Sequence, residues 1–186
     1  MRTLLLLLAV LASCRPERVE NPHQHVPISH NPEIQQDVGG TAPDTSMVKS
    51  ADGSAVDLTK LWADKRVVLV FYMGHWCPDC TKQLNSLNEH QKDFADKNTT
   101  VIAVSTDTPE DVGQLKAKLG LGFDVYSDTD LQTIAKWGVE NYDTNIAKPA
   151  TFVIQKGGAV TFKKIGGSMT DRPSVDEVLA QLTDPS

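Results

Sequence analysis

The chain has 186 residues, of which 40% are hydrophobic and 23% charged, as expected for one globular domain with an additional tail. The formal charge of −6 excludes a typical nucleic-acid binder, because no excess of lysine and arginine is available to neutralise phosphates. No apolar run is long enough to span a bilayer.

The first residues have the pattern of an export signal. Arg2 is followed by an apolar run from Leu4 to Ala12, and the run ends in Leu11-Ala12-Ser13-Cys14. This resembles a bacterial lipoprotein signal, which implies that residues 1–13 are removed and that Cys14 is the lipidation site. We therefore expect an exported protein, lipid-anchored to a bacterial membrane and facing the periplasm or extracytoplasmic space. The alternative is an ordinary secretory signal with an incidental cysteine.

Residues 14–36 are predicted to form a flexible tether, and residues 37–186 the domain. The tether carries four prolines among polar residues, so it cannot build a core. Three tether histidines, His23, His25 and His30, could catch a metal ion, but their spacing fixes no ligand geometry. A solvated linker is the favoured interpretation.

The first half of the domain shows strand signals on either side of one long helix. Val67 to Tyr72 is apolar at every position, as in a central strand covered on both faces. Leu84, Leu87, Gln91 and Phe94 form one stripe of the helix that follows. The expected elements are a hairpin of 45–49 and 55–58, a strand at 67–72, a helix at 77–97 and a strand at 100–105.

The second half shows clear helix boundaries. Thr108 is placed to cap a helix that starts at Pro109 and stops at Gly120. Ser174 and Glu177 form a capping-box pattern that opens the last helix. The remaining expected elements are a short helix at 130–137 and strands at 151–155 and 159–164. Together they predict an α/β fold with a central mixed β-sheet flanked by helices.

The cysteines carry the chemistry. There are three, and lipidation of Cys14 leaves the pair Cys77 and Cys80. The pair lies where a buried strand ends and a helix begins, and a helix N-terminus stabilises a thiolate. Cysteines at i and i+3 share one helix face and can close a disulfide reversibly. The pattern therefore predicts a redox pair.

The two sulfurs are not equivalent in this pattern. Cys80 is in line with Leu84 and Leu87 and should point inward, whereas Cys77 starts the helix and should be the more exposed. This favours Cys77 as the attacking thiolate and Cys80 as the resolving thiol. Two alternatives remain. A zinc site needs four ligands, of which the pair supplies two, and a purely structural disulfide over so short a loop adds little stability.

Four segments carry a family resemblance. They are "GGTAPD" (39–44), "VVLVFYMGHWCPDC" (67–80), "KPATFVI" (148–154) and "DRPSVDEVLAQL" (171–182). The chain resembles the thioredoxin-fold redoxins, in particular the peroxiredoxin-like branch of the alkyl hydroperoxide reductase/thiol-specific antioxidant family. The resemblance implies a thioredoxin-like fold.

The resemblance implies two activities. Peroxidatic members resemble Phe-Tyr-Pro-x-x-x-Thr-x-x-Cys, with an arginine from a distant strand. Laid on this chain, the reactive cysteine falls at Cys80, while the proline, threonine and arginine positions are Met73, Cys77 and Pro149. Without those donors a thiolate lacks preorganised help for peroxide cleavage.

The same positions resemble a thioredoxin. Trp76-Cys77-x-x-Cys80 matches its active-site motif, and Pro149 falls where thioredoxins carry a cis-proline; a strand-entry proline is the alternative. Trp76 is expected to shield the disulfide or simply to pack. The charge of Asp79 would raise the pKa of the thiols slightly, or Asp79 merely occupies the first turn of the helix. His75 could alter the pKa of Cys77 or have no role in the chemistry.

We therefore predict a membrane-tethered thiol–disulfide oxidoreductase that uses the Cys77–Cys80 redox-active disulfide. It needs no cofactor or metal. Its partners would be a protein or small-molecule disulfide and an upstream thiol electron donor. The first alternative is a thiol-dependent peroxidase, an antioxidant peroxiredoxin acting on peroxide. The second is a copper-binding chaperone of the same fold, whose members typically place three residues between the cysteines.

Overall fold

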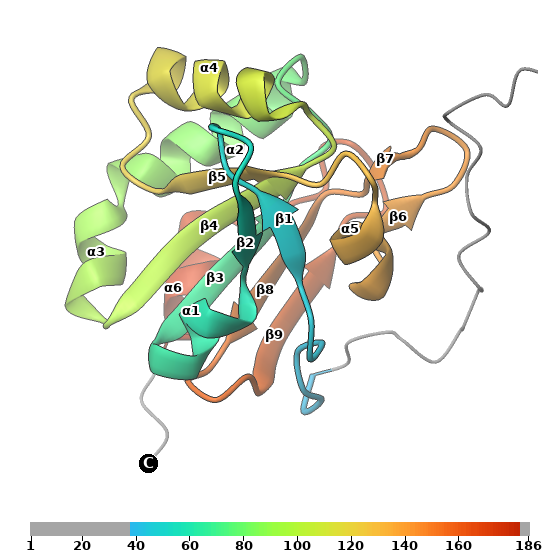
Figure 1. Ribbon diagram of the computed structural model, residues 1–186. Helices are drawn as coiled ribbons and strands as arrows, with labels where there is room; N and C mark the ends of the chain where they lie inside the picture. The colour runs from blue at the N-terminus through green and yellow to red at the C-terminus, as the bar shows by residue number, and fades with distance from the viewer. Residues whose placement is uncertain (1–37, 183–186) are drawn as a thin grey trace, which may run out of the picture. The chain divides into compact units, whose positions relative to one another are not determined.

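The computed structural model describes residues 38–182. A seven-stranded mixed sheet forms its centre, in the order β2-β1-β5-β4-β3-β8-β9 (Figure 1). The strands are β1 (Met47–Lys49), β2 (Ala55–Asp57), β3 (Arg66–Phe71), β4 (Thr99–Ser105), β5 (Asp124–Ser127), β8 (Ala150–Ile154) and β9 (Val160–Ile165). A separate two-stranded ribbon pairs β6 (Glu140–Asn141) with β7 (Ile146–Ala147). The signal peptide, the tether and Cys14 predicted above lie outside the described residues.

The central strand is buried on both faces, as its continuous apolar sequence predicts. All six residues of β3 are buried, and the strand pairs in parallel with β4 and antiparallel with β8. Val68 and Val70 belong to one core cluster, whereas Leu69 and Phe71 belong to the other. This alternation follows from the two-residue period of a strand.

Helices cover both faces of this sheet. The helices α2 (Pro78–Glu89), α3 (Gln91–Asp96), α4 (Pro109–Leu119) and α6 (Val175–Ala180) contribute to the core cluster of Val68 and Val70. The helices α1 (Thr59–Asp64) and α5 (Gln132–Lys136) contribute to the opposite cluster. Figure 1 accordingly shows α1 and α5 in front of the sheet and α2 and α6 behind it. The predicted α/β fold with a mixed sheet is confirmed.

The predicted helix boundaries hold where the caps are strong. Thr108 accepts a hydrogen bond from the Asp111 N–H, and Gly120 ends α4 in the left-handed conformation with φ 60°. Ser174 and Glu177 form the complete capping box of α6. The hairpin β1–β2 also forms as predicted, and the strands expected at 151–155 and 159–164 are present as β8 and β9, which pair antiparallel.

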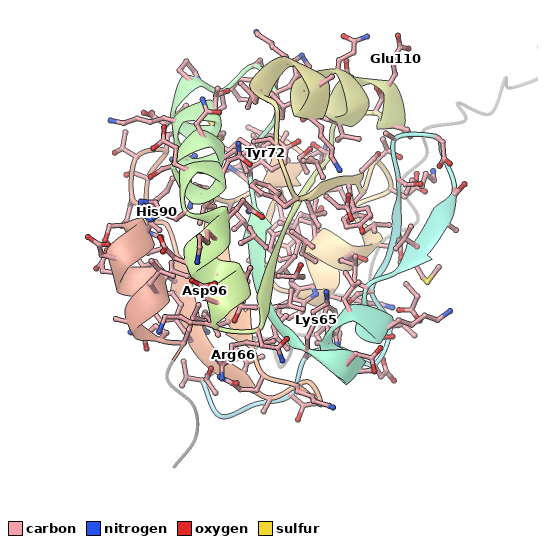
Figure 2. The ribbon with its side chains drawn as sticks, turned by 90° about the vertical axis from the view of Figure 1, so that its left-hand side faces the viewer. Lys65, Arg66, Tyr72, His90, Asp96 and Glu110 are labelled. Atoms are coloured by element: carbon pink, nitrogen blue, oxygen red, sulfur yellow. A yellow bond between two sulfur atoms is a disulfide. The ribbon has the colours of Figure 1, made fainter. Side chains whose placement is uncertain are left out.

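The prediction of a single long helix over 77–97 is wrong. His90 leaves the helical conformation, with φ −102° and ψ 17°, and divides the segment into α2 and α3. Two side-chain contacts accompany the break: His90 Nδ1 lies 2.8 Å from Asp93 Oδ2, and Asn88 bonds the backbone of Gly120 and Gly122. Figure 2 labels His90 at this junction.

The strand order brings several loops together at one end of the central strands. Because β3 and β4 are parallel, their carboxyl ends meet at the same edge. Phe71 at the end of β3 also lies opposite Ala150, the first residue of β8. The loops that follow β3 and β4 and the loop that precedes β8 therefore converge there. No helix within residues 38–182 is long and apolar enough to cross a membrane.

Candidate active site

The cysteine pair lies at the sheet edge where β3 gives way to α2. Cys77 is the N-cap of α2, Pro78 occupies the first turn, and the Cys80 N–H donates to Cys77 Sγ at 3.3 Å. Cys77 and Cys80 are joined in a disulfide with their Cα atoms 5.2 Å apart. The predicted pairing is present, and it closes within a single helical turn.

The predicted difference in exposure between the two cysteines is wrong. Cys80 points inward as expected and is 1% exposed, but Cys77 is 0% exposed. Both cysteines belong to the core cluster that contains Tyr72, Met73 and Leu84. Cys77 is packed in the core although it is the N-cap of α2. Burial alone therefore does not tell the two sulfurs apart.

A cation contacts the disulfide from a distant part of the chain. Arg172 lies between β9 and α6, and its Nη2 is 3.0 Å from Cys80 Sγ and 3.8 Å from Cys77 Sγ. Partial burial lowers the pKa of Arg172, and the nearby negative charge of Asp79 opposes this. The guanidinium nevertheless stays charged at neutral pH, because arginine is not deprotonated in proteins.

The sequence analysis assigned Arg172 no role. It is more than 90 residues from the cysteines along the chain, and local patterns give no sign of such a contact. The available signal was its place in the segment "DRPSVDEVLAQL", which was used only for the family resemblance.

A groove of about 550 Å³ lies beside Arg172, and neither cysteine is among its lining residues. Residues of α2 and α6 line it, together with Thr151 of β8 and Arg172. Buried Leu87, Val175 and Val178 supply apolar lining. The volume falls within the range of small-ligand sites.

Pro149 directly precedes β8 and is buried next to the site. It lines a smaller hollow of about 210 Å³ together with Met73 and Met169, among others. No peptide bond within residues 38–182 is cis. Pro149 is therefore a proline at the entry of a strand, and it does not have the cis geometry of the proline found at this position in thioredoxins.

Trp76 directly precedes Cys77 and is an exposed residue. It is 53% exposed, and a Cβ at Gly74 would overlap its indole nitrogen. Close packing of the ring on the backbone therefore requires glycine at position 74. The guanidinium of Arg172, not the indole of Trp76, is the group found within hydrogen-bonding distance of the sulfurs.

Asp107 anchors the loop in front of the cysteines. Its carboxylate accepts hydrogen bonds from the His75 N–H at 2.8 Å and from the Ser105 hydroxyl at 2.9 Å, and His75 Nδ1 lies 2.9 Å away. The Asp107 side chain is 6% exposed and the His75 side chain 46%. The sequence analysis left Asp107 without a role, because His75 and Asp107 follow different strands and meet only through the parallel pairing of β3 and β4.

Tyr72 lies between α2 and α4 (Figure 2), where the charge of Asp107 acts on it. Its side chain is fully buried and lies close to Ser105 and Asp107. Burial raises the pKa of Tyr72, and the negative charge of Asp107 adds to this effect. Tyr72 is therefore a neutral wall of the site.

Residues 38–182 contain no group of three or more His, Cys, Asp or Glu side chains arranged to hold a metal ion. The tether histidines considered as metal ligands lie outside the described residues. Within the described part, the chemistry of the site rests on two sulfurs and one guanidinium.

The fold and the site together define a thiol-dependent oxidoreductase with a thioredoxin-like fold. Residues 38–163 match the AhpC/TSA family, and the chain belongs to it. It is 29% identical over 116 residues to a putative peroxiredoxin of Mycobacterium tuberculosis, covering 59% of this chain and 73% of the relative. It is 27% identical over 150 residues to alkyl hydroperoxide reductase E of Mycobacterium bovis, covering 78% of this chain and 97% of the relative.

Solved structures agree on the fold. The crystal structure of peroxidoxin BcpB from Mycobacterium tuberculosis superposes with a TM-score of 0.67 at 26% identity, over 76% of this chain and 96% of that one. A peroxiredoxin-like protein from Aquifex aeolicus gives a TM-score of 0.70 at 23% identity, over 80% and 86% of the two chains. The predicted thioredoxin-like fold is confirmed.

Proposed function

We propose that the protein is a thiol-dependent peroxidase in which Cys80 attacks the peroxide and Cys77 resolves the product. One observation carries this proposal: Cys80, at the family's reactive position, is already bonded to Cys77 within one helical turn. A sulfur oxidised at Cys80 therefore has its resolving partner in the same domain. The relatives named as a putative peroxiredoxin and as an alkyl hydroperoxide reductase support the same class of reaction.

The reaction has two steps. The Cys80 thiolate attacks one oxygen of the hydroperoxide, the O–O bond breaks, and Cys80 becomes a sulfenic acid while the leaving oxygen takes a proton to form an alcohol or water. The Cys77 thiol then attacks the Cys80 sulfur, which forms the disulfide and releases water. Two equivalents of an external thiol return the pair to the dithiol by exchange, and that thiol is oxidised to its disulfide.

A second candidate is the disulfide reductase expected from the Trp-Cys-x-x-Cys motif. It is favoured by the hydrogen bond from the Cys80 N–H to Cys77 Sγ at the N-terminus of α2, which would stabilise a Cys77 thiolate. Cys77 would attack a substrate disulfide to form a mixed disulfide, and Cys80 would then release the reduced product. The two candidates differ in the sulfur that attacks.

Two single variants separate the candidates. The peroxidase proposal predicts that Cys77→Ser still consumes one equivalent of hydroperoxide, whereas Cys80→Ser consumes none. Steady-state turnover with dithiothreitol as the reductant should require Cys80 and should slow in Cys77→Ser. The reductase candidate predicts instead that Cys80→Ser traps a mixed disulfide on Cys77 and that no variant consumes peroxide.

We also propose that this chemistry takes place outside the cytoplasm, on a membrane to which a lipid on Cys14 anchors the chain. The support is the sequence pattern of residues 1–14, with a basic start, an apolar run and a terminal Cys14. The anchor would be lipid and not charge, because the chain is acidic. In a bacterial host, fatty-acid labelling should mark the full chain and disappear in Cys14→Ser; equal labelling of both would contradict the anchor.

A further inference from the structure

His75 and Asp107 form a histidine–carboxylate pair directly in front of the cysteines. We propose that His75 is the base that takes the proton of the Cys77 thiol when Cys77 attacks oxidised Cys80, and that Asp107 is the residue that orients it. This inference rests on the proposed function, because it names the group that makes the resolving step of that reaction fast. It adds one imidazole to the two sulfurs and the guanidinium of the site.

Two contacts fix the imidazole of His75. Asp107 Oδ2 accepts a hydrogen bond from the His75 backbone N–H at 2.8 Å, and Asp107 Oδ1 lies 2.9 Å from Nδ1 of the ring. The carboxylate is itself held, because Oδ2 also accepts from the Ser105 hydroxyl at 2.9 Å. An ionised carboxylate can only accept, so Nδ1 carries the proton and Nε2 is the basic nitrogen of the ring.

A turn carries His75 to the start of α2. The Cys77 N–H donates to the carbonyl oxygen of Gly74 at 3.1 Å, so His75 and Trp76 occupy the two central positions of the turn. The Cα atoms of His75 and Cys77 are therefore at most about 7 Å apart, which allows the side chains to meet directly or through one water molecule. The His75 side chain is 46% exposed, which leaves room for Nε2 to take up a proton.

Cys77 depends on a base supplied by the protein. It is 0% exposed and packs with Tyr72 and Met73 in the apolar core, so bulk water does not reach its sulfur. Apolar surroundings hold a thiol in its protonated form, which is a poor nucleophile. The Cys80 N–H lies 3.3 Å from Cys77 Sγ at the N-terminus of α2, so a thiolate is stabilised there once the proton has left.

Two carboxylates favour the protonated imidazole that this transfer produces. Asp107 is in contact with the ring, and its side chain is 6% exposed. Asp111, in the first turn of α4, also acts on His75. The hydrogen bond from Thr108 is the largest cause of the lowered pKa of Asp111, and the positive charge of His75 is a smaller one. By reciprocity, the same negative charges stabilise the imidazolium of His75.

Asp79 is a less suitable base for Cys77. It lies between the cysteines in sequence, but it lines the groove beside Arg172, and its charge acts on that cation. A carboxylate is in general a weaker base than an imidazole, and a general base is most effective when its pKa is near the operating pH. His75 therefore fits the role better.

The proton is returned to the leaving group in the same step. The Cys77 S–H bond breaks, and the proton moves to Nε2 of His75. The thiolate attacks the Cys80 sulfur, so that the S–S bond forms and the S–O bond of the sulfenic acid breaks. The hydroxide leaves with the proton from Nε2 as water, and His75 is neutral again. The Cys77 sulfur is oxidised and the Cys80 sulfur reduced, so the step needs no further oxidant.

The test follows disulfide closure in the reduced full chain after one equivalent of hydroperoxide. Samples are quenched with a thiol-alkylating reagent, and mass spectrometry separates the dithiol, the sulfenic acid and the disulfide. At neutral pH we expect His75→Gln to close the disulfide about 100-fold more slowly than the parent protein, within the range of general base catalysis. At about pH 9.5 the two rates should differ by less than about threefold, because Cys77 then loses its proton without help.

His90→Gln is the matched control. His90 also pairs with a carboxylate, that of Asp93 at 2.8 Å, but it lies at the other end of α2, about 20 Å from Cys77 along the helix. This variant should close the disulfide within about twofold of the parental rate, because the His90–Asp93 pair is exposed.

Two further variants separate a base from a structural ring. Free imidazole added to His75→Ala should restore part of the closure rate at neutral pH, whereas a ring that only holds the loop would not be replaced from solution. Asp107→Asn should slow closure by at least about tenfold, because its amide can donate to Nδ1 and so favour the tautomer with the proton on Nε2. Thermal unfolding of each variant confirms that the compared proteins are folded.

Three results would overturn the inference. The first is equal closure by His75→Gln and the parent protein at neutral pH. The second is a loss in His75→Gln that persists unchanged at about pH 9.5, since an alkaline solution replaces a missing base. The third is a loss in His90→Gln as large as that in His75→Gln.

Failure of the proposed function gives a different result. If peroxide is consumed through Cys80 while closure ignores His75→Gln, the peroxidase stands and the role of His75 is wrong. If the reduced protein consumes no peroxide, the peroxidase is wrong, and the base is tested by iodoacetamide alkylation of Cys77 in the Cys80→Ser variant. Adding His75→Gln should then lower the alkylation rate at neutral pH by about tenfold or more, and an unchanged rate would overturn the inference.

Discussion

Substitution of Asp107 tests whether this buried carboxylate holds the loop in front of the cysteines in place. Asp107→Ala removes a buried carboxylate that accepts hydrogen bonds from the His75 N–H and the Ser105 hydroxyl and pairs with His75 Nδ1. The substitution leaves these donors without their acceptor, and Ser105 is fully buried. A hydrogen bond to a charged group contributes about 1.5–3 kcal/mol, but desolvation of the carboxylate offsets part of the total.

We expect a net loss of about 3 kcal/mol in the free energy of unfolding, within the range for breaking a buried charged contact. For a domain of this size the melting temperature should fall by about 6–12 °C. Asp107→Asn keeps the shape and one acceptor, so it should fall between Asp107→Ala and the parent protein. Urea denaturation of the oxidised proteins at neutral pH measures the free energy of unfolding of the parent protein and of both variants.

The matched control is Asp130→Ala, which also removes one member of an ion pair. Asp130 lies 3.3 Å from Lys49, but the two side chains are 68% and 43% exposed. Exposed pairs contribute less than about 1 kcal/mol, because solvent screens them. If Asp107→Ala lost no more stability than this control, the claim that Asp107 holds the loop in place would be refuted.

Two further predictions concern other parts of the domain. Burial raises the pKa of Asp128 from 3.8 to about 6, so the folded state favours the protonated form of this side chain. The stability that this contributes is about 3 kcal/mol. It is fully present below about pH 4 and is lost as the pH rises through about 6. Asp128→Asn keeps an acceptor for the Ile134 N–H and should flatten this part of the pH–stability curve; an unchanged pH slope would contradict it. Ser174→Ala breaks the capping box of α6 and should cost about 1 kcal/mol by urea denaturation, whereas no measurable loss would show that the cap is dispensable.

Local sequence signals predicted those elements whose boundaries are set by local chemistry. The apolar run of β3, the Thr108 cap with the Gly120 stop, and the Ser174 capping box each occur within a few residues. The break at His90 was missed, because it is accompanied by a contact from Asn88 to the loop of Gly120 and Gly122, which lies more than 30 residues away. The short strand β5 and the helix α1 were missed as well, because neither shows a strong period of its own.

The features of the site also separate into those that local sequence predicted and those that depend on tertiary contacts. The Cys77–Cys80 pairing follows from a spacing of three residues, and the sequence predicted it. The burial of Cys77 and the approach of Arg172 depend on how the loops at one sheet edge close over the start of α2. The pairing of His75 with Asp107 requires knowledge that β3 and β4 lie side by side in parallel. Such contacts are tertiary, so the sequence named the sulfurs but not the groups that act on them.

The most direct test of the central claim is a single-turnover oxidation of the reduced protein, with the oxidised sulfur located by mass spectrometry. The Cys77→Ser variant is mixed with one equivalent of hydroperoxide, and a sulfenic-acid trap is added. We predict a trapped sulfenic acid on Cys80, and a Cys77–Cys80 disulfide in the parent protein treated in the same way. Oxidation of Cys77 in Cys80→Ser, together with an unreacted Cys80 in Cys77→Ser, would contradict the account.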